Sequence, residues 1–234
     1  MAQDSVTVAG DTMTLEVAQT CIGRHCSAPA SRWEPDVSRA VDVDPESLRF
    51  YASGYRSYDC VPAAPGRALE VSDVLVAAGQ GAGLQGGTVD GVLGILHELN
   101  ACLQRLPDPT PKLWELRPEE LFDEGGLAAY AGPMWTAAAL LMNVQGVTIL
   151  TTHAILHHKL PTLFPLLDRR TIGRFSRRSE ALRETHADLR RDAAAWTVLE
   201  TWHRDTIVPR LRLPGAVALN RLRLHALLLD ARTT

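Results

Sequence analysis

A long stretch without a charged side chain constrains this chain more than any other feature. From Gly125 to His158 there is no Asp, Glu, Lys or Arg, so the stretch belongs either in a membrane or in a protein core. A proline, an asparagine and a glycine interrupt it, and such residues are costly against lipid. We therefore expect two buried helices, near 126–143 and 148–158, joined at Gly146.

The composition is that of a folded, globular protein. Hydrophobic residues make up 46% of the 234 residues and charged residues 22%, which argues against wholesale disorder. From residue 66 onwards the apolar spacing is helical, whereas residues 1–65 are mostly irregular. We expect a mainly α fold: a helical bundle over 66–234 that forms one compact unit with residues 1–65.

Local patterns predict the remaining elements. Residues 5–17 alternate in the manner of a short β-hairpin around Gly10. The glycine-rich run over 80–87 follows no strand, so it does not predict a dinucleotide-binding loop. Further helices are expected near 45–52, from Ser72 through Ala78, from a cap at Thr88 to Pro107, over 171–203 with a break near 175–179, and, after a turn at Pro209 and Pro214, from Ala216 to about Asp230.

Charge is distributed unevenly along the chain. Residues 1–144 hold 9 basic against 19 acidic residues, a net charge of −10, and residues 145–234 hold 15 against 8, a net charge of +7. A basic final part suits contact with phosphate groups. Alternatively, the two parts neutralise one another within one domain, and the sequence leaves both interpretations open.

Histidines and cysteines offer two possible metal sites. Cys21, His25 and Cys26 lie close together, but no second ligand pair follows at zinc-site spacing. His153 and His157 are one helical turn apart and share a face, a spacing that can hold a metal. Because no HExxH glutamate accompanies them, we expect surface or hydrogen-bonded histidines, and we expect no metal and no cofactor.

The middle of the uncharged stretch predicts a helix, a tight turn and a second helix. Gly146 permits the sharp turn, and Leu141, Val144 and Val147 would pack it. In such a helix–hairpin–helix element, the backbone N–H groups of the turn and of the next helix are unpaired donors at the positive end of a dipole. They can hold a phosphate group, so Gly146, Val147 and Thr148 are candidate nucleic-acid-binding residues.

This segment resembles the hairpin of the helix–hairpin–helix DNA glycosylase superfamily. Beyond it, Phe164-Pro-Leu-Leu-Asp168 matches a Phe-Pro-x-x-Asp form in the alkyl-base branch of that superfamily. The resemblance implies that Asp168 stabilises the cationic sugar that develops as the base leaves, or orients a water. It also implies that Arg169, Arg170 and Arg174 lie near phosphates. Without the resemblance, Asp168 reads as a helix cap.

Two positions depart from the glycosylase pattern. Thr148 replaces the second glycine of the hairpin, and its Cβ would strain a turn that needs a positive φ there. Leu150 replaces the lysine with which bifunctional members form a Schiff base. The resemblance therefore implies, at most, a monofunctional enzyme that hydrolyses the N-glycosidic bond with Asp168.

A second resemblance covers more of the chain, from about Phe50 to Leu229. The chain is similar to a family of uncharacterised bacterial proteins that share a segment like SDVLVAAGQG, a Leu-Trp pair (here Leu113-Trp114), the hairpin, and a Pro-x-Leu-x-Pro-x-x-Asp run ending here at Asp168. The lysine expected by that family falls at Ala154. This resemblance implies a shared fold rather than a function.

Three functions remain as alternatives. The first is a nucleic-acid-binding or DNA-glycosylase-like protein, with DNA as its partner. The second is a non-catalytic member of the same scaffold that serves as a partner or regulatory protein. The third is a small-molecule enzyme that reuses the helical core, with His153, His157 and Asp168 in a pocket. The first residues, MAQDSV, predict no secretory signal, so we expect a cytoplasmic protein without a membrane segment.

Overall fold

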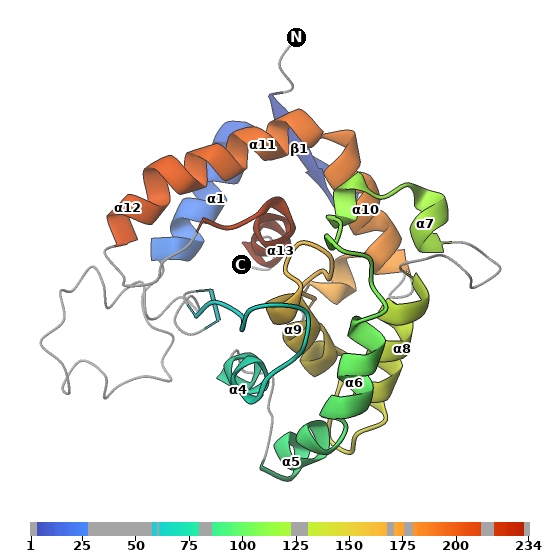
Figure 1. Ribbon diagram of the computed structural model, residues 1–234. Helices are drawn as coiled ribbons and strands as arrows, with labels where there is room; N and C mark the ends of the chain where they lie inside the picture. Colours follow the sequence, from blue (N-terminus) through green and yellow to red (C-terminus); the bar gives the residue numbers. More distant parts are fainter. Residues whose placement is uncertain are drawn as a thin grey trace, which may run out of the picture.

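The computed structural model is mainly helical, as predicted, with a short two-stranded sheet at the N-terminal end (Figure 1). It describes residues 4–27, 58–59, 61–79, 86–122, 131–167, 171–175, 180–211 and 218–231. The helix expected near 45–52 lies outside these residues. None of the helices within them is long and apolar enough to cross a membrane.

The predicted β-hairpin is present. Strand β1 (Ser5–Val8) pairs antiparallel with β2 (Asp11–Thr14), and the turn between them places Ala9 and Gly10 at φ 50° and 82°. Helix α1 (Leu15–Ser27) follows directly. The prediction of irregular chain after the hairpin was therefore wrong for residues 18–27. Every fourth residue of α1, namely Ala18, Ile22 and Cys26, is buried, and two of these side chains are too small to make the period obvious.

Two carboxylates hold the hairpin on the C-terminal helices. Asp192 accepts a hydrogen bond from the Thr7 N–H at 2.6 Å, and Asp188 accepts one from the Ala9 N–H at 2.8 Å. Asp188 lies on α10 (Ala181–Arg191) and also contacts the Nε2 of His225, at 3.1 Å, on α13 (Arg221–Ala231). These bonds satisfy N–H groups that an edge strand would otherwise leave unpaired.

The helix expected between Thr88 and Pro107 is two helices, α5 (Gly86–Gly94) and α6 (Leu96–Leu103). They meet at Ile95, whose φ of −108° and ψ of 10° break the helical path. Glycine is a poor helix former, and α5 ends at one. The assignment of Thr88 as the first cap was wrong, because the helix begins before it. Ser72 likewise lies inside α4 (Val71–Gly79).

Two helices occupy the uncharged stretch, as predicted. They are α8 (Ala131–Met142) and α9 (Ile149–Lys159). Helix α9 packs against both α4 and α8, and from Thr151 to Lys159 only His153 is more than marginally exposed. The apolarity of the stretch therefore reflects a central helix of the core.

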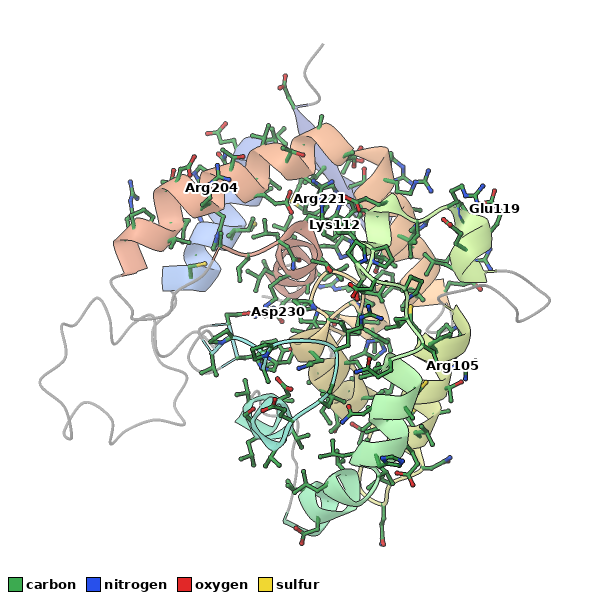
Figure 2. All side chains as sticks on the ribbon, viewed as in Figure 1. Arg105, Lys112, Glu119, Arg204, Arg221 and Asp230 are labelled. Carbon is green, nitrogen blue, oxygen red and sulfur yellow. The ribbon has the colours of Figure 1, made fainter. Side chains whose placement is uncertain are left out.

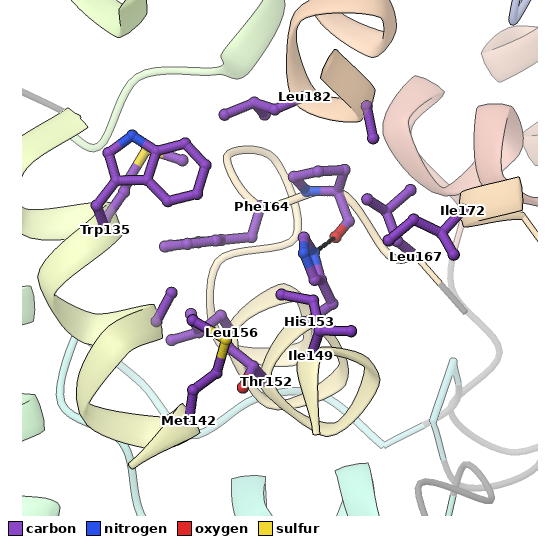
Figure 3. A pocket seen from close by; sticks show the side chains of 14 residues that line it. Trp135, Met142, Ile149, Thr152, His153, Leu156, Phe164, Leu167, Ile172 and Leu182 are labelled. Atoms are coloured by element: carbon purple, nitrogen blue, oxygen red, sulfur yellow. Dashed lines mark hydrogen bonds between the residues drawn. The ribbon is translucent and has the colours of Figure 1, made fainter. Parts of the chain in front are cut away.

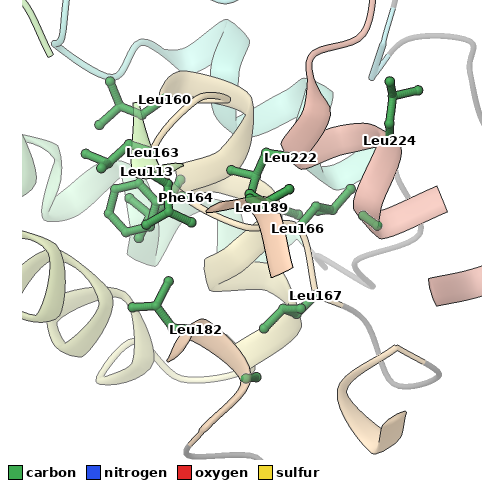
Figure 4. Packing of buried hydrophobic residues seen from close by; sticks show 14 of the residues in the cluster. Leu113, Leu160, Leu163, Phe164, Leu166, Leu167, Leu182, Leu189, Leu222 and Leu224 are labelled. Atoms are coloured by element: carbon green, nitrogen blue, oxygen red, sulfur yellow. The ribbon is translucent and has the colours of Figure 1, made fainter. Parts of the chain in front are cut away.

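The remaining elements surround this centre. The hydrophobic core around α9 is rich in leucines, which Figure 4 shows converging from several segments. Pro209, expected in a turn, lies inside a helix, and the last helix begins at Arg221 within the described residues. The elements not yet named are η1 (Leu113–Glu115), α7 (Pro118–Phe122), η2 (Ile172–Arg174), α11 (Ala193–Trp202), the π-helical turn η4 (His203–Ile207) and α12 (Val208–Leu211).

Candidate functional site

The turn between α8 and α9 is tight and centred on Gly146, whose φ is +84°. The Val147 N–H donates to the carbonyl of Val144 at 3.0 Å, which closes the turn. Leu141 is fully buried, and Val144 and Val147 are half-buried against the core. The predicted packing of the turn is confirmed, and so is the need for glycine at residue 146.

Thr148 plays a different part from the one expected. Its φ of −107° and ψ of 168° are ordinary extended values, so the turn requires no positive φ there and the predicted strain was wrong. Thr148 is instead the N-cap of α9, and its Oγ1 accepts a hydrogen bond from the Thr151 N–H at 3.3 Å. Threonine is a favourable residue at this position.

Helix α5 packs closely against the turn, a contact that sequence reasoning missed. A Cβ built on Gly146 would lie 2.5 Å from the Oγ1 of Thr88, and one on Gly91 would lie 2.6 Å from Val144. The two glycines allow α5 and the turn to approach this closely. Nothing in the sequence connects residues so far apart, although the glycines themselves were a signal.

Two of the three histidines of α9 hold the loop that follows the helix. The ring Nδ1 of His153 lies 2.8 Å from the carbonyl oxygen of Pro165, and that of His157 lies 2.5 Å from the oxygen of Phe164. A carbonyl only accepts, so each Nδ1 carries the hydrogen. Burial lowers the pKa of both rings, that of His157 to about 4, and both are therefore neutral at pH 7.

This loop leads directly to the segment that contains three predicted site residues. Asp168, Arg169 and Arg170 lie outside the residues that the structure describes. The neighbours on either side, Leu167 and Thr171, are buried. Of the predicted arginines, Arg174 lies within the described residues, and it is exposed on η2.

A buried ion pair lies near the C-terminal end of α9. Arg223 of α13 donates two hydrogen bonds to Asp59, from Nε and from an Nη, each 2.8 Å long. Beside this pair is a cavity of about 250 Å³ that Tyr58, His157 and Asn220 also line. The phenol of Tyr58 donates to the carbonyl of Ala154 at 2.9 Å, and burial raises the pKa of Tyr58 well above its ordinary value.

A second buried ion pair, between Lys159 and Asp73, also involves α9. The Nζ of Lys159 donates to Asp73 Oδ2 at 3.2 Å and to the carbonyl of Ala64 at 2.7 Å. The Asp73 carboxylate also accepts from the N–H groups of Ala64 and Glu70. Sequence reasoning missed both ion pairs, because their partners are far apart in the chain. All four charged groups are buried and paired by hydrogen bonds, as a stable buried ion pair requires.

Many arginines of the basic final part are paired with acidic neighbours. Arg221 donates to Glu200 at 2.8 Å and lies over the ring of Trp114, as does Lys112. Figure 2 labels Arg221 and Lys112 close together. Arg204 binds the adjacent Asp205, and Arg191 lies 3.6 Å from Asp188. These three pairs lie within residues 145–234 and leave the net charge of that part at +7, whereas Arg223–Asp59 and Lys159–Asp73 join it to the acidic first part.

The described residues contain no group of three or more His, Cys, Asp or Glu side chains placed to hold a metal ion. His153 and His157 turn their Nδ1 atoms to carbonyls. They also line different cavities, one on each side of α9. The structure does not bring the two rings together in one site.

Comparison with known proteins gives one match. No curated protein and no solved structure matches the chain. The model of DUF6308, a family of unknown function, matches residues 67–221, about two thirds of the chain. The matched region contains the hairpin, both histidines and Asp168. The predicted likeness to an uncharacterised family is confirmed to this extent, and the chain belongs to DUF6308.

Proposed function

We propose that this protein binds nucleic acid through the α8–α9 hairpin, as a helix–hairpin–helix protein with a DNA-glycosylase-like architecture. One observation carries the proposal. The glycine turn at Gly146 is followed at once by a helix whose N-cap is Thr148. This combination aims backbone donors at the surface, as phosphate binding requires.

The donors are specific backbone groups. The Thr148 hydroxyl accepts from the Thr151 N–H, and the Thr148 carbonyl accepts from the Thr152 N–H. The N–H groups of Ile149 and Leu150 belong to the first helical turn, which has no intrahelical acceptor for them. Gly146 and Ile149 are exposed, so a phosphate can approach. No acidic side chain of the uncharged stretch opposes it.

The proposal extends to Asp168 as the group that assists hydrolysis of an N-glycosidic bond. Its support is the loop before it, because His153 and His157 hold two consecutive carbonyls of that loop. A carboxylate at the end of a fixed loop suits the stabilisation of a developing positive charge. Leu150 stands where a Schiff-base lysine would be needed, so the proposed reaction is hydrolysis alone. Arg169, Arg170 and Arg174 would contact phosphates.

Binding is tested by changing the charge of an exposed side chain beside the turn. Gln145 is exposed beside Gly146, so Gln145→Glu places a negative charge near the donors and Gln145→Lys a positive one. We expect Gln145→Glu to weaken binding of a labelled DNA duplex about 5-fold or more at low salt, and Gln145→Lys to strengthen it. Fluorescence anisotropy over a salt series measures both affinity and its salt dependence.

The matched control makes the same changes at Gln104. Gln104 is exposed and follows α6 directly. The end of α6 lies near the start of α8 rather than near the turn, because Cys102 Sγ lies 3.0 Å from the carbonyl oxygen of Pro133. Gln104→Glu and Gln104→Lys should leave DNA affinity within about 2-fold of wild type. Equal effects at the two positions, or no affinity for DNA at low salt, would contradict the proposal.

Catalysis is tested separately with Asp168→Asn. We expect the wild-type protein to release a base from a duplex that contains alkylated purines, and Asp168→Asn to bind the duplex but lose this release by about 100-fold or more. Undiminished release by Asp168→Asn would remove Asp168 from the mechanism. Binding without release by the wild-type protein would favour the non-catalytic alternative.

A further inference from the structure

A second cavity lies between α8 and α9, on the side of α9 away from the buried ion pairs. Its volume is about 300 Å³, and its walls come from α8, α9, the loop before residue 168 and the start of α10 (Figure 3). A dry apolar cavity of ~150 Å³ already binds benzene in an engineered protein. This cavity has room for a larger ring system.

The lining is apolar and includes aromatic and flexible side chains. Phe164 from the loop and Trp135 from α8 present rings to the cavity, and Met134 and Met142 also line it. None of the lining residues is an Asp, Glu, Lys or Arg. An ion would be poorly solvated here, so the chemistry favours an uncharged ligand.

The mouth of the cavity is also apolar. Trp135, Met142 and Ile149 are exposed by 53%, 44% and 37%, and all three line the cavity. Large apolar side chains gathered at the surface of a pocket are typical of a binding site. They allow an apolar molecule to enter without passing charged groups.

Two residues of this apolar lining carry a polar side chain. Thr152 is 1% exposed, and its Oγ1 has no hydrogen-bond partner within the described part of the chain. A buried hydroxyl without a partner is unfavourable, and this one belongs to a residue of the cavity wall. His153 donates from Nδ1 to Pro165 and, because burial lowers its pKa, keeps Nε2 as an acceptor.

We propose that this cavity binds a small, uncharged aromatic molecule that carries one hydrogen-bonding group, and that this group pairs with Thr152. A flat ring fits beside Trp135 and Phe164, and methionines adapt to its outline. The volume suits one fused ring system rather than a helix or a second copy of the chain. The site adjoins the proposed DNA contact at Ile149, but residues 143–148 do not line it.

Indole and 1-methylindole form a suitable pair of probes, because they have nearly the same shape and only indole has an N–H donor. We expect indole to bind the wild-type protein more tightly than 1-methylindole does. Thr152→Val keeps the shape and removes the hydroxyl, so it should weaken indole by about 3- to 10-fold, the effect of one hydrogen bond. The affinity for 1-methylindole should stay the same. Isothermal titration calorimetry measures all four affinities.

A second variant tests whether the probes occupy the cavity. Ala138 is buried in its wall, so Ala138→Phe should abolish binding of both probes, whereas Ala139→Phe, on the exposed face of α8, should not. If Ala138→Phe does not fold, Leu182→Trp at the other wall replaces it. Undetectable binding of both probes to the wild-type protein, or full binding by the filled variant, overturns the proposal. Gln145→Glu should leave indole binding unchanged, which separates this result from the DNA experiment.

Discussion

Threonines on α9 have opposite roles although they lie one helical turn apart. The hydroxyl of Thr148 accepts from a backbone N–H and lies 3.1 Å from the hydroxyl of Thr151. Within the part of the chain that the structure describes, the hydroxyl of Thr152 has no such partner. A cap stabilises the start of a helix, whereas a buried, unpaired hydroxyl destabilises the fold. The three threonines lie within five residues of sequence, and only the structure shows which hydroxyl has a partner.

Thr148→Ala should lower the free energy of unfolding by about 1 kcal/mol, because the Thr151 N–H loses its acceptor. Thr148→Ser keeps the hydroxyl and should lie within about 0.5 kcal/mol of wild type. Urea denaturation measures both values. An alanine variant as stable as the serine variant would show that the cap contributes nothing.

Thr152→Val should have the opposite sign. It removes an unpaired hydroxyl and keeps the branched shape, so the ligand-free protein should gain about 1 kcal/mol of stability. The same change at the exposed Thr20, whose hydroxyl donates to the Glu16 carbonyl, should give a change near zero. A loss of stability in Thr152→Val would mean that the hydroxyl is satisfied in solution.

Among the elements, the α8–α9 hairpin and α5 form one unit. The turn needs glycine at residue 146 for two independent reasons: its positive φ and the closeness of Thr88. The first reason is local to the turn. The second depends on contact with a helix more than fifty residues earlier in the chain.

Gly146→Ala should therefore cost stability through both effects, about 2 kcal/mol or more. Thr88→Ala removes the atom that the new Cβ would meet, so the double variant should recover part of this loss but not the part due to φ. A double-mutant cycle by urea denaturation measures the coupling. Strict additivity of the two changes would contradict the contact.

The elements that the sequence predicted are those with strong local signals. The uncharged stretch located α8 and α9, and the alternation around Gly10 located the first hairpin. Helix α1 was missed because its buried face is made partly of alanine and cysteine. The break at Ile95 was missed because its apolar neighbours continue the helical spacing. Next to the candidate site, the tight turn at Gly146 was predicted correctly, but the conformation of Thr148 depends on a φ value that no spacing reveals.

At the scale of the whole molecule, buried polar groups join segments that are far apart in the chain. Asp59 and Arg223 tie a segment before α4 to the last helix, and Asp188 and Asp192 tie the first strand to α10. None of these partners could be paired from sequence, because only the fold brings them together.

Removing one partner of the Asp59–Arg223 pair should be strongly destabilising. Arg223→Met leaves a buried carboxylate unpaired and should cost about 3–5 kcal/mol. Adding Asp59→Asn to it removes the uncompensated charge and should restore part of the loss. Urea midpoints of the two variants give the comparison. A double variant less stable than Arg223→Met would contradict the pairing.

The free energy of unfolding should also decrease when the pH is lowered through a defined range. Burial lowers the pKa of His157 and His203 to about 4, below their ordinary value of 6.5. Between these values the unfolded chain binds protons that the folded protein does not, so the free energy of unfolding decreases as the pH falls from about 6.5 towards 4. Each ring contributes on the order of 3 kcal/mol over this range.

His157→Asn and His203→Asn should flatten this decline, since asparagine does not titrate and can replace the ring Nδ1 in its hydrogen bond. His97→Asn, at an exposed position of α6, is the matched control and should leave the slope unchanged. Denaturant unfolding at several pH values measures each slope. Slopes equal to wild type in the two buried variants would contradict neutral, buried imidazoles.

The most direct measurement of the central claim is an NMR titration of the isotope-labelled protein with a short DNA duplex at low salt. Contact between phosphates and the α8–α9 hairpin predicts that the largest amide shifts fall on Gly146, Ile149 and Leu150. These shifts should fade as salt is added, because phosphate contacts are screened. Amide shifts confined to other parts of the molecule, or no shifts at all, would contradict nucleic-acid binding by this hairpin.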